Sequence, residues 1–258
     1  MKKNPTEVVR IATSNNFNCT DKEWSQLHHF QNTNPDKAFF INCNINTPKL
    51  ITVTEHNVKV VVTANPGCNI NQSEIKPIIS RLQTIKTRIA FVRLKYLPGN
   101  LNIDNLLRSL INAGFPVVIT VQRFNGKASL NKYVPNNQQD YEFSCSRYRL
   151  TGQALKTLND YVVLQREILN NPVWICDQSG LGCSECGLCS KLTTGLDLKI
   201  SSLNLSSSGI CPYNCPDCYA KTMQHFTVSM GHSAIHFDII KQNHKQSGKT
   251  AHIKQNQV

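Results

Sequence analysis

The 258-residue sequence predicts an α/β protein with a mostly parallel sheet or a partial (β/α) barrel, followed by a cysteine-rich C-terminal third. Strand-like and helix-like segments alternate between residues 58 and 121, which is typical of the crossover connections of a parallel sheet. The run Val117–Val121 is apolar throughout and therefore fits a strand covered on both faces. Seven of the eleven cysteines lie between Cys176 and Cys218, and they set the last third apart.

These patterns divide the chain into four parts. Residues 1–35 form an N-terminal segment with weak signals, and residues 36–172 form the α/β core. The cysteine-rich region at 173–228 is expected to complete that core. Residues 229–258 carry a run of basic side chains and predict a flexible, solvated tail.

The first elements follow from local signals. A short helix is expected to begin at Thr20, because Thr20 and Glu23 stand at the spacing of a capping box. On such a helix the adjacent His28 and His29 point about 100° apart, so we interpret both as surface histidines. Runs rich in β-branched and aromatic residues then predict strands over residues 38–45, 50–54 and 58–63.

The rest of the core alternates in the same way. Helical spacing predicts helices over residues 73–82 and 103–113, and apolar runs predict strands over residues 88–94 and 116–121. The polar stretch 122–150, with Gly126 and Pro135, predicts a loop. Beyond it the sequence predicts a helix over 151–170, a strand over 196–205 and a further helix over 219–228.

Three basic residues follow or end predicted strands of the core, namely Arg93, Lys95 and Arg123. Active-site groups gather at the carboxyl ends of parallel strands, both in barrels and in open sheets. Each of the three could therefore hold a carboxylate or a phosphate. The alternative interpretation is a charged strand end in solvent.

The cysteines form two groups that are each compact enough to bind a metal. In the first group the spacers are six, two and two residues, and its members are Cys176, Cys183, Cys186 and Cys189. In the second group the spacers are three and two residues, and its members are Cys211, Cys215 and Cys218. Thiolates this close, with Gly and Pro between them, can converge on one ion or cluster. The last third is therefore expected to bind metal.

The two groups differ in the coordination they can complete. Four cysteines close a tetrahedral sphere, so the first group fits either a structural zinc ion or a second, auxiliary iron–sulfur cluster. Three cysteines leave one position open on a zinc ion or on a four-iron cluster, and an open position is what catalysis requires. If the second group bound zinc, His225, His232 or His236 could supply the fourth ligand.

The second group, in a predicted loop after a strand, resembles the C-x3-C-x2-C signature of the radical S-adenosylmethionine enzymes. The resemblance implies a 4Fe-4S cluster held by Cys211, Cys215 and Cys218, with S-adenosyl-L-methionine bound to the remaining iron. It also implies a partial barrel. Asp217 stands where that superfamily usually has an aromatic residue, and only 40 residues follow Cys218.

Both groups together resemble the phage "gene product 88" family. That resemblance is carried by Leu203-Asn-Leu205, by Cys218-Tyr-Ala220 and by the Cys-Gly-Leu-Cys run that ends at Cys189. The four-cysteine element comes first here, which is the reverse of the order in that family. The resemblance implies a circular permutation, in which residues 196–205 form the first strand of the sheet, and it implies a phage-encoded protein in the host cytoplasm.

The net positive charge of the chain indicates an alternative function. The formal net charge is +12 and the isoelectric point is about 9.3, which favours nucleic acid or another anionic partner. A zinc-stabilised nucleic-acid-binding protein without catalysis therefore stands as the alternative to an iron–sulfur enzyme of unknown substrate. A brown protein would indicate iron–sulfur, and a colourless one zinc.

The remaining signals concern the compartment. No apolar stretch is long enough for a signal peptide or a membrane span, so we expect a cytoplasmic protein with no membrane partner. A reducing cytosol also suits metal-bound thiolates better than a disulfide framework. The isolated Cys19, Cys43, Cys68 and Cys145 are interpreted as buried or incidental.

Overall fold

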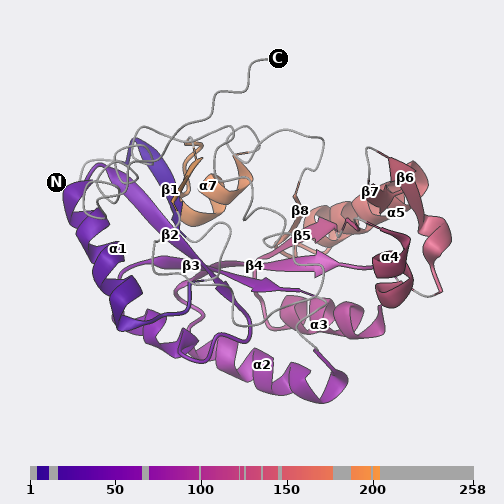
Figure 1. Cartoon of the computed structure of the whole chain (residues 1–258), viewed down its shortest axis with the longest axis horizontal. Helices are drawn as coiled ribbons and strands as arrows, with labels where there is room; N and C mark the ends of the chain where they lie inside the picture. Colours follow the sequence, from indigo (N-terminus) through magenta and orange to yellow (C-terminus); the bar gives the residue numbers. More distant parts are fainter. Residues whose placement is uncertain are drawn as a thin grey trace, which may run out of the picture.

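The computed structural model describes residues 5–203, except for positions 12–16, 66–69, 99, 122, 125, 135, 145–146, 177–186 and 199. Within this part of the chain, seven strands form one sheet in the order β8-β5-β4-β3-β2-β1-β9, and every neighbouring pair is parallel. The strands are β1 (Glu7–Ile11), β2 (Lys37–Asn44), β3 (Lys59–Ala64), β4 (Ile89–Tyr96), β5 (Val117–Val121), β8 (Val173–Ile175) and β9 (Ile200–Leu203). The sheet curls into a half-barrel (Figure 1). The predicted α/β class and its parallel sheet are confirmed.

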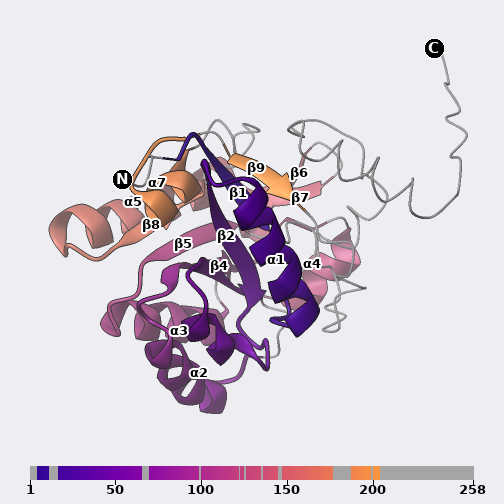
Figure 2. The same ribbon diagram turned by 90° about the vertical axis from the view of Figure 1, so that its left-hand side faces the viewer.

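The last strand of the described chain lies beside the first. β9 pairs with β1 in register from Val8 opposite Ile200 to Ile11 opposite Leu203, and Figure 2 shows the two strands side by side. If β9 is counted first, the other strands of the sheet follow in chain order, namely β1, β2, β3, β4, β5 and β8. The predicted strand over residues 196–205 is thus confirmed at Ile200–Leu203, at an edge of the described sheet.

Helices cover the two faces of the sheet unequally. One face, called the outer face here, packs against α1 (Asp21–Thr33), α2 (Gln72–Thr84), α3 (Leu101–Asn112) and α5 (Gly152–Val163), which a π-helical turn extends over Leu164–Ile168. The opposite face, called the inner face, carries the short helix α7 (Leu188–Thr194), drawn in orange in Figure 1.

Local capping explains where the outer helices begin. Thr20 accepts a hydrogen bond from the Glu23 amide and the Glu23 carboxylate accepts from the Thr20 amide, so the predicted capping box is present. Three further side chains cap α2, α3 and α5, namely Asn71, Asn100 and Thr151. The caps satisfy backbone amides that the first helical turn leaves without partners.

One predicted strand is wrong: residues Leu50–Glu55 form a 3-10 helix, η1. Leu50 and Val53 are buried and stand three residues apart, whereas Ile51 between them is 47% exposed. That spacing fits the 3.0 residues per turn of a 3-10 helix, because a strand would place Leu50 and Val53 on opposite faces. The β-branched composition of this stretch therefore led to the wrong prediction of a strand.

The predicted loop over residues 122–150 is also wrong in part. It contains α4 (Lys127–Tyr133), the 3-10 turn η3 (Gln138–Asp140) and a hairpin of β6 (Tyr141–Ser144) and β7 (Arg147–Leu150). Buried aromatic rings stabilise this unit: Phe124 packs edge-on against Tyr141 with ring centroids 5.5 Å apart. Because polar residues separate these rings in the sequence, the composition of the stretch indicated a loop.

Three elements had no sequence prediction. β1 and β8 are short, and α7 lies between the first cysteine group and the strand expected over residues 196–205. The predicted helix over 219–228 and the basic tail at 229–258 lie outside the described residues. None of the described helices is both long enough and apolar enough to cross a membrane.

Candidate functional site

The inner face of the sheet has an apolar floor. Its residues come from alternate positions of the strands and pack against α7, and they include Val8, Phe40, Val61, Phe91, Val118 and Ile200. Trp174 of β8 and Leu188 and Leu192 of α7 pack against this floor. Because successive strand residues point to opposite faces, the next inner-face positions along each strand can be assigned directly.

Beyond the floor, toward the carboxyl ends of the strands, the inner-face positions become polar. One row runs across three strands through Asn44, Thr63 and Arg93, which are register partners. In a second row, Lys95 pairs with Thr120. Cys176 continues this row on the next strand, because Ile175 pairs with Ile119 and the Cys176 amide donates to the Ile119 carbonyl at 2.7 Å. We call these six residues the polar rows. They lie at the edge where ligands bind in parallel α/β folds.

Three of the six polar-row residues are buried, and the other three are half-buried. Asn44 is fully buried, Thr63 is 5% exposed and Lys95 is 8% exposed, and the nearby Asn42 is 5% exposed. The interpretation of Lys95 as a strand-end charge in solvent is therefore wrong. Within the described chain, Asn42 Oδ1 and Thr120 Oγ1 are buried without a hydrogen-bond partner. Buried polar atoms of this kind cost free energy unless something supplies the missing bond, so the arrangement favours a bound polar group.

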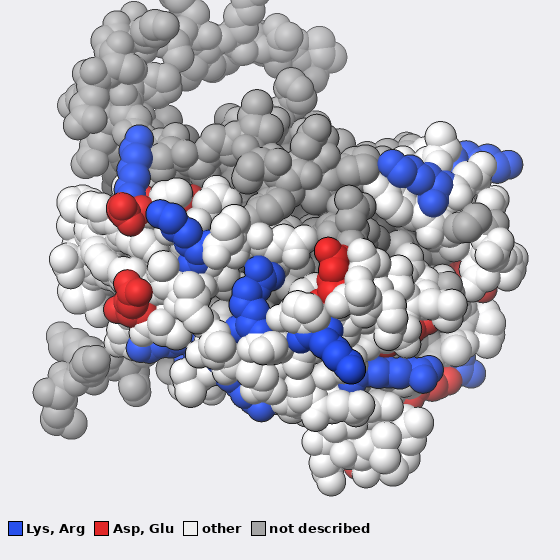
Figure 3. All heavy atoms as spheres, turned by 90° about the horizontal axis from the view of Figure 1, so that it is seen from below, with Lys and Arg blue, Asp and Glu red and all other residues white. Residues whose placement is uncertain are grey.

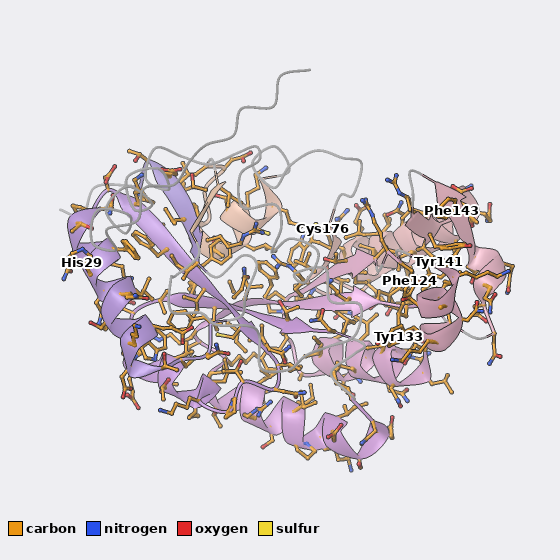
Figure 4. All side chains as sticks on the ribbon, in the orientation of Figure 1. His29, Phe124, Tyr133, Tyr141, Phe143 and Cys176 are labelled. Carbon is orange, nitrogen blue, oxygen red and sulfur yellow. The ribbon has the colours of Figure 1, made fainter. Side chains whose placement is uncertain are left out.

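Two cysteines of the first group lie on this face. Cys176 follows the last residue of β8, and Cys189 lies in the first turn of α7 and is 7% exposed. Both belong to the cluster around the apolar floor, and Figure 4 shows Cys176 on the α7 side of the sheet. Cys176 and Cys189, the first and last cysteines of the predicted group, thus belong to separate parts of the fold and lie on the same face, as a shared metal would require.

Arg93 links the polar rows to the first cysteine group. Its Nη2 donates to Cys189 Sγ at 3.6 Å, and its guanidinium lies 5.6 Å from the centroid of the Phe91 ring. The contact thus places a positive charge beside a sulfur atom that the spacing predicts as a metal ligand. One of the three strand-end cations singled out in the sequence is therefore in contact with a predicted ligand.

The backbone around Cys189 requires glycine. Gly187 has φ 64°, and a Cβ atom there would lie 2.5 Å from Asp197 Oδ1. Asp197 pairs with Lys191 at 2.9 Å, and Ser190 Oγ donates to the Leu196 carbonyl at 2.8 Å. These contacts hold α7 in place, so the Cys-Gly-Leu-Cys run places its last sulfur at a defined position on the inner face.

The other predicted ligands cannot be placed. Cys183, Cys186, Cys211, Cys215 and Cys218 lie outside the described residues. Within the described part of the chain, no three His, Cys, Asp or Glu side chains come together as a metal site. The two described members nevertheless fit a thiolate metal centre, because both reach the inner face and one has a cation beside its sulfur.

The isolated cysteines behave as expected where they are described. Cys19 and Cys43 are buried in the core of the outer face, with their Sγ atoms 3.9 Å apart. Burial raises the pKa of the Cys43 thiol, and the neighbouring Cys19 raises it further, so this thiol stays protonated. Cys68 and Cys145 lie outside the described residues.

Two features outside the inner face were not found from the sequence. His28 Nε2 and His56 Nδ1 lie 3.2 Å apart, and the His56 ring stacks on Trp24 with centroids 3.7 Å apart. A cavity of about 360 Å³ lies between β4, α3 and α5, where burial raises the pKa of Asp104 although Tyr96 and Arg108 counteract it. The residues that form the histidine pair and those that line the cavity do not form a recognisable sequence motif.

No protein-family model matches the chain, and no curated protein sequence is similar to it at a significant level. The geometry of the inner face and the cysteine spacing are therefore the features of this chain that indicate a function.

Proposed function

We propose that this protein is an iron–sulfur enzyme of the radical S-adenosylmethionine type, with a substrate that binds on the inner face of its half-barrel. In this proposal Cys211, Cys215 and Cys218 hold a 4Fe-4S cluster. Cys176, Cys183, Cys186 and Cys189 hold a second centre, zinc or iron–sulfur, whose role is mainly structural. When bound, the 4Fe-4S cluster would supply one electron to S-adenosylmethionine and so begin radical chemistry.

The position of β9 is the observation that carries the proposal. β9 is parallel to β1, so its carboxyl end lies at the same edge of the sheet as the polar rows. Cys211 follows Leu203 by eight residues, and eight residues span at most about 28 Å. A chain of this length would allow Cys211, the first member of the second group, to reach the inner face. In parallel barrels this edge holds the active site.

The order of the strands supports the same proposal. A sheet that begins at β9 and then follows chain order is the arrangement expected from a circular permutation of a partial barrel. Such a permutation accounts for a cysteine motif that is late in the sequence and yet follows the first strand of the sheet in space.

The described residues have definable roles in this proposal. Arg93 donates to Cys189 and so favours an anionic sulfur at the second centre. The buried Lys95 and the orphaned oxygens of Asn42 and Thr120 would orient a polar group of the bound cofactor or substrate. The apolar floor below them, with Phe91 and Trp174, excludes water from that part of the inner face.

The test is a metal and acid-labile sulfide analysis on protein purified without oxygen, together with the visible spectrum. Wild type is compared with Cys215→Ala and Cys189→Ala, which each remove one ligand of one group. Cys43→Ala serves as the matched control, because Cys43 is buried in the outer core and belongs to neither group. Formation of 5′-deoxyadenosine from S-adenosylmethionine under reducing conditions is measured next.

Iron and sulfide that fall in Cys215→Ala and persist in Cys43→Ala would support the proposal, and so would 5′-deoxyadenosine formed by wild type alone. The Cys189→Ala variant then shows whether the first group holds iron or zinc, from the metal that it loses. Zinc without sulfide in wild type would overturn the radical chemistry. In that case the zinc-stabilised, non-catalytic alternative would take its place.

A further inference from the structure

We infer that His28 and His56 together bind a divalent metal ion of the zinc, nickel and copper class, and that this ion links α1 to the 3-10 helix η1. The inference goes beyond the proposed function, because neither histidine belongs to a cysteine group or to a strand of the inner face. It is carried by the separation of two ring nitrogens, by the contacts that hold both rings and by the accessibility of the pair.

The two ring nitrogens lie at the separation that a shared ion requires. His28 Nε2 and His56 Nδ1 are 3.2 Å apart, although the two residues are 28 positions apart in the chain. Two imidazole nitrogens that each lie about 2.0–2.1 Å from a tetrahedral zinc ion are about 3.3 Å from each other. An ion can therefore bind both nitrogens without a rearrangement of the backbone.

Without an ion, the same separation fits a hydrogen bond between two neutral imidazoles, in which one of the facing nitrogens carries the shared proton. The neutral imidazole is also the form of histidine that binds a metal. When the ion binds, the shared proton moves to the other nitrogen of its ring or to water, and both facing nitrogens become ligands. The hydrogen bond thus keeps the two ligand atoms together before the ion arrives.

Trp24 holds the His56 ring in place. The two rings are stacked, with centroids 3.7 Å apart and planes 23° apart. Trp24 is 5% exposed, and its Nε1 donates to Thr52 Oγ1 of η1 at 3.3 Å. His56 directly follows η1, so its ring is fixed both by the stacking and by the helix before it. Because the ring is already ordered, binding of an ion costs little additional protein entropy.

His28 reaches the same place from α1, where it stands four residues after Trp24 and therefore shares its face of the helix. The ring centroids of Trp24 and His28 are 6.5 Å apart. His29 is the next residue and points about 100° away around the helix, with its ring 5.9 Å from that of Phe30. Figure 4 shows His29 at the outer edge of the molecule. The tertiary structure thus brings His28, and not His29, to His56.

The pair is accessible from solvent, since His28 is exposed and His56 is half-buried. Within the part of the chain that the structure describes, no third His, Cys, Asp or Glu side chain completes a metal site, so water would fill the other positions. Imidazole ligands suit zinc, nickel and copper ions, whereas magnesium and calcium ions prefer oxygen. We therefore expect an exchangeable ion here, unlike one enclosed by four cysteines.

The charge of the protein does not favour cations. The net charge is +12, and Figure 3 shows Lys and Arg side chains distributed over the lower face of the molecule, with Asp and Glu between them. A positive net charge repels divalent cations, so the two ligand nitrogens must supply the binding energy. Selectivity between nickel and magnesium ions is therefore a direct test of the site.

The experiment uses the full-length protein and follows tryptophan fluorescence while Ni²⁺ is added. The chain has two tryptophans, Trp24 and Trp174, so every protein carries Trp174→Phe and reports on Trp24 alone. Ni²⁺ is paramagnetic and quenches a tryptophan beside it. His28→Gln is compared with His29→Gln, which is the matched control because it makes the same substitution at an exposed position of the same helix. Mg²⁺ is titrated in parallel, and circular dichroism checks that each variant is folded.

We expect Ni²⁺ to quench Trp24 with a saturable curve. The midpoint should rise about tenfold or more in His28→Gln, since even an outer-shell partner of a metal site is worth about 10–100-fold in affinity. His29→Gln should keep the midpoint, and Mg²⁺ should leave the fluorescence unchanged. Ni²⁺ should also raise the melting temperature less in His28→Gln and His56→Gln than in His29→Gln, because an ion that binds only the folded state stabilises it.

Three results would overturn the inference. Absence of quenching would show that the pair forms a hydrogen bond and binds no ion. Equal midpoints in His28→Gln and His29→Gln would assign the ion to other ligands. Equal quenching by Mg²⁺ would indicate an unspecific effect of charge. None of these results depends on the metal that the cysteine groups hold, so a zinc protein without sulfide would overturn the radical chemistry and leave this inference standing.

Discussion

The two faces of the sheet differ sharply although they share the same strands. On β4, Val92 and Leu94 point to the outer face and are fully buried in its aliphatic core, while Arg93 and Lys95 point to the inner face. The outer core continues through four helices, whereas the apolar floor of the inner face is small and gives way to the polar rows. Alternation along one strand therefore separates the residues of the aliphatic core from the charged residues of the inner face.

Energetics explain why this separation is informative. Burial of an outer-face Val or Leu side chain stabilises the folded state by about 1.5–3 kcal/mol. Burial of a polar atom without a partner costs about 1–3 kcal/mol. Asn42 and Thr120 carry such atoms on the inner face. The inner face therefore holds polar groups at positions where apolar residues would stabilise the fold more.

The largest expected effect compares two adjacent residues of β4. Leu94→Ala should lower the free energy of unfolding by about 2–5 kcal/mol, because Leu94 is fully buried in the outer core. Lys95→Met keeps a similar volume, and we expect a change of less than about 1.5 kcal/mol. Urea unfolding followed by circular dichroism measures both. Equal losses would show that both faces serve stability alone.

A second pair of variants exchanges nearly isosteric residues in opposite directions. Val62→Thr places a hydroxyl in the outer core and should cost about 1–3 kcal/mol. Thr120→Val removes the orphaned hydroxyl of the inner face and should be neutral or stabilise by up to about 1 kcal/mol. The same unfolding measurement applies. A large loss in Thr120→Val would mean that this hydroxyl already has a partner and would weaken the case for a ligand there.

A smaller change in the free energy of unfolding is expected in the helical layer of the outer face. Thr20→Ala removes the cap of α1 and should cost about 1 kcal/mol, whereas Thr20→Ser retains the hydroxyl and should cost much less. Both variants are compared by their urea midpoints. If Thr20→Ser loses as much as Thr20→Ala, the methyl group matters more than the capping bond.

The smallest effect concerns pH at the edge of the outer layer. Burial lowers the pKa of His56 below its usual 6.5, and the neighbouring His28 lowers it further. The unfolded chain then binds more protons than the folded one near and below pH 6.5, so stability should fall as the pH drops through that range. Melting temperatures across this window should show the decline, and His28→Gln should make it shallower. An unchanged slope in His28→Gln would rule out coupling between the two rings.

Prediction from sequence succeeded where the signal was local. The capping box at Thr20, the helices α2 and α3 and the strands β3 and β5 follow from spacing over a few residues. It failed at Leu50–Glu55, where β-branched composition concealed a three-residue period. It also missed β1, a five-residue strand whose pairing partners lie far away in the chain.

The candidate site was predictable only in part. Spacing singled out Cys176 and Cys189 as members of one group, and strand-end position singled out Arg93 and Lys95. The sequence did not reveal that Lys95 is buried or that Arg93 contacts Cys189, because burial depends on what the rest of the chain places over a residue. The hairpin was taken for a loop, since its buried rings are separated by polar residues.

By itself, the sequence determined the α/β class, most of the helices and strands, and the spacing of the cysteines, because these depend on neighbours within one or two turns. Only the tertiary structure decided that β9 lies beside β1, where Ser201 donates to Glu7 across 194 positions of sequence. It also decided that Arg93 meets Cys189 across 96 positions. Contacts at such separations arise from the packing of the whole sheet, so no local pattern encodes them.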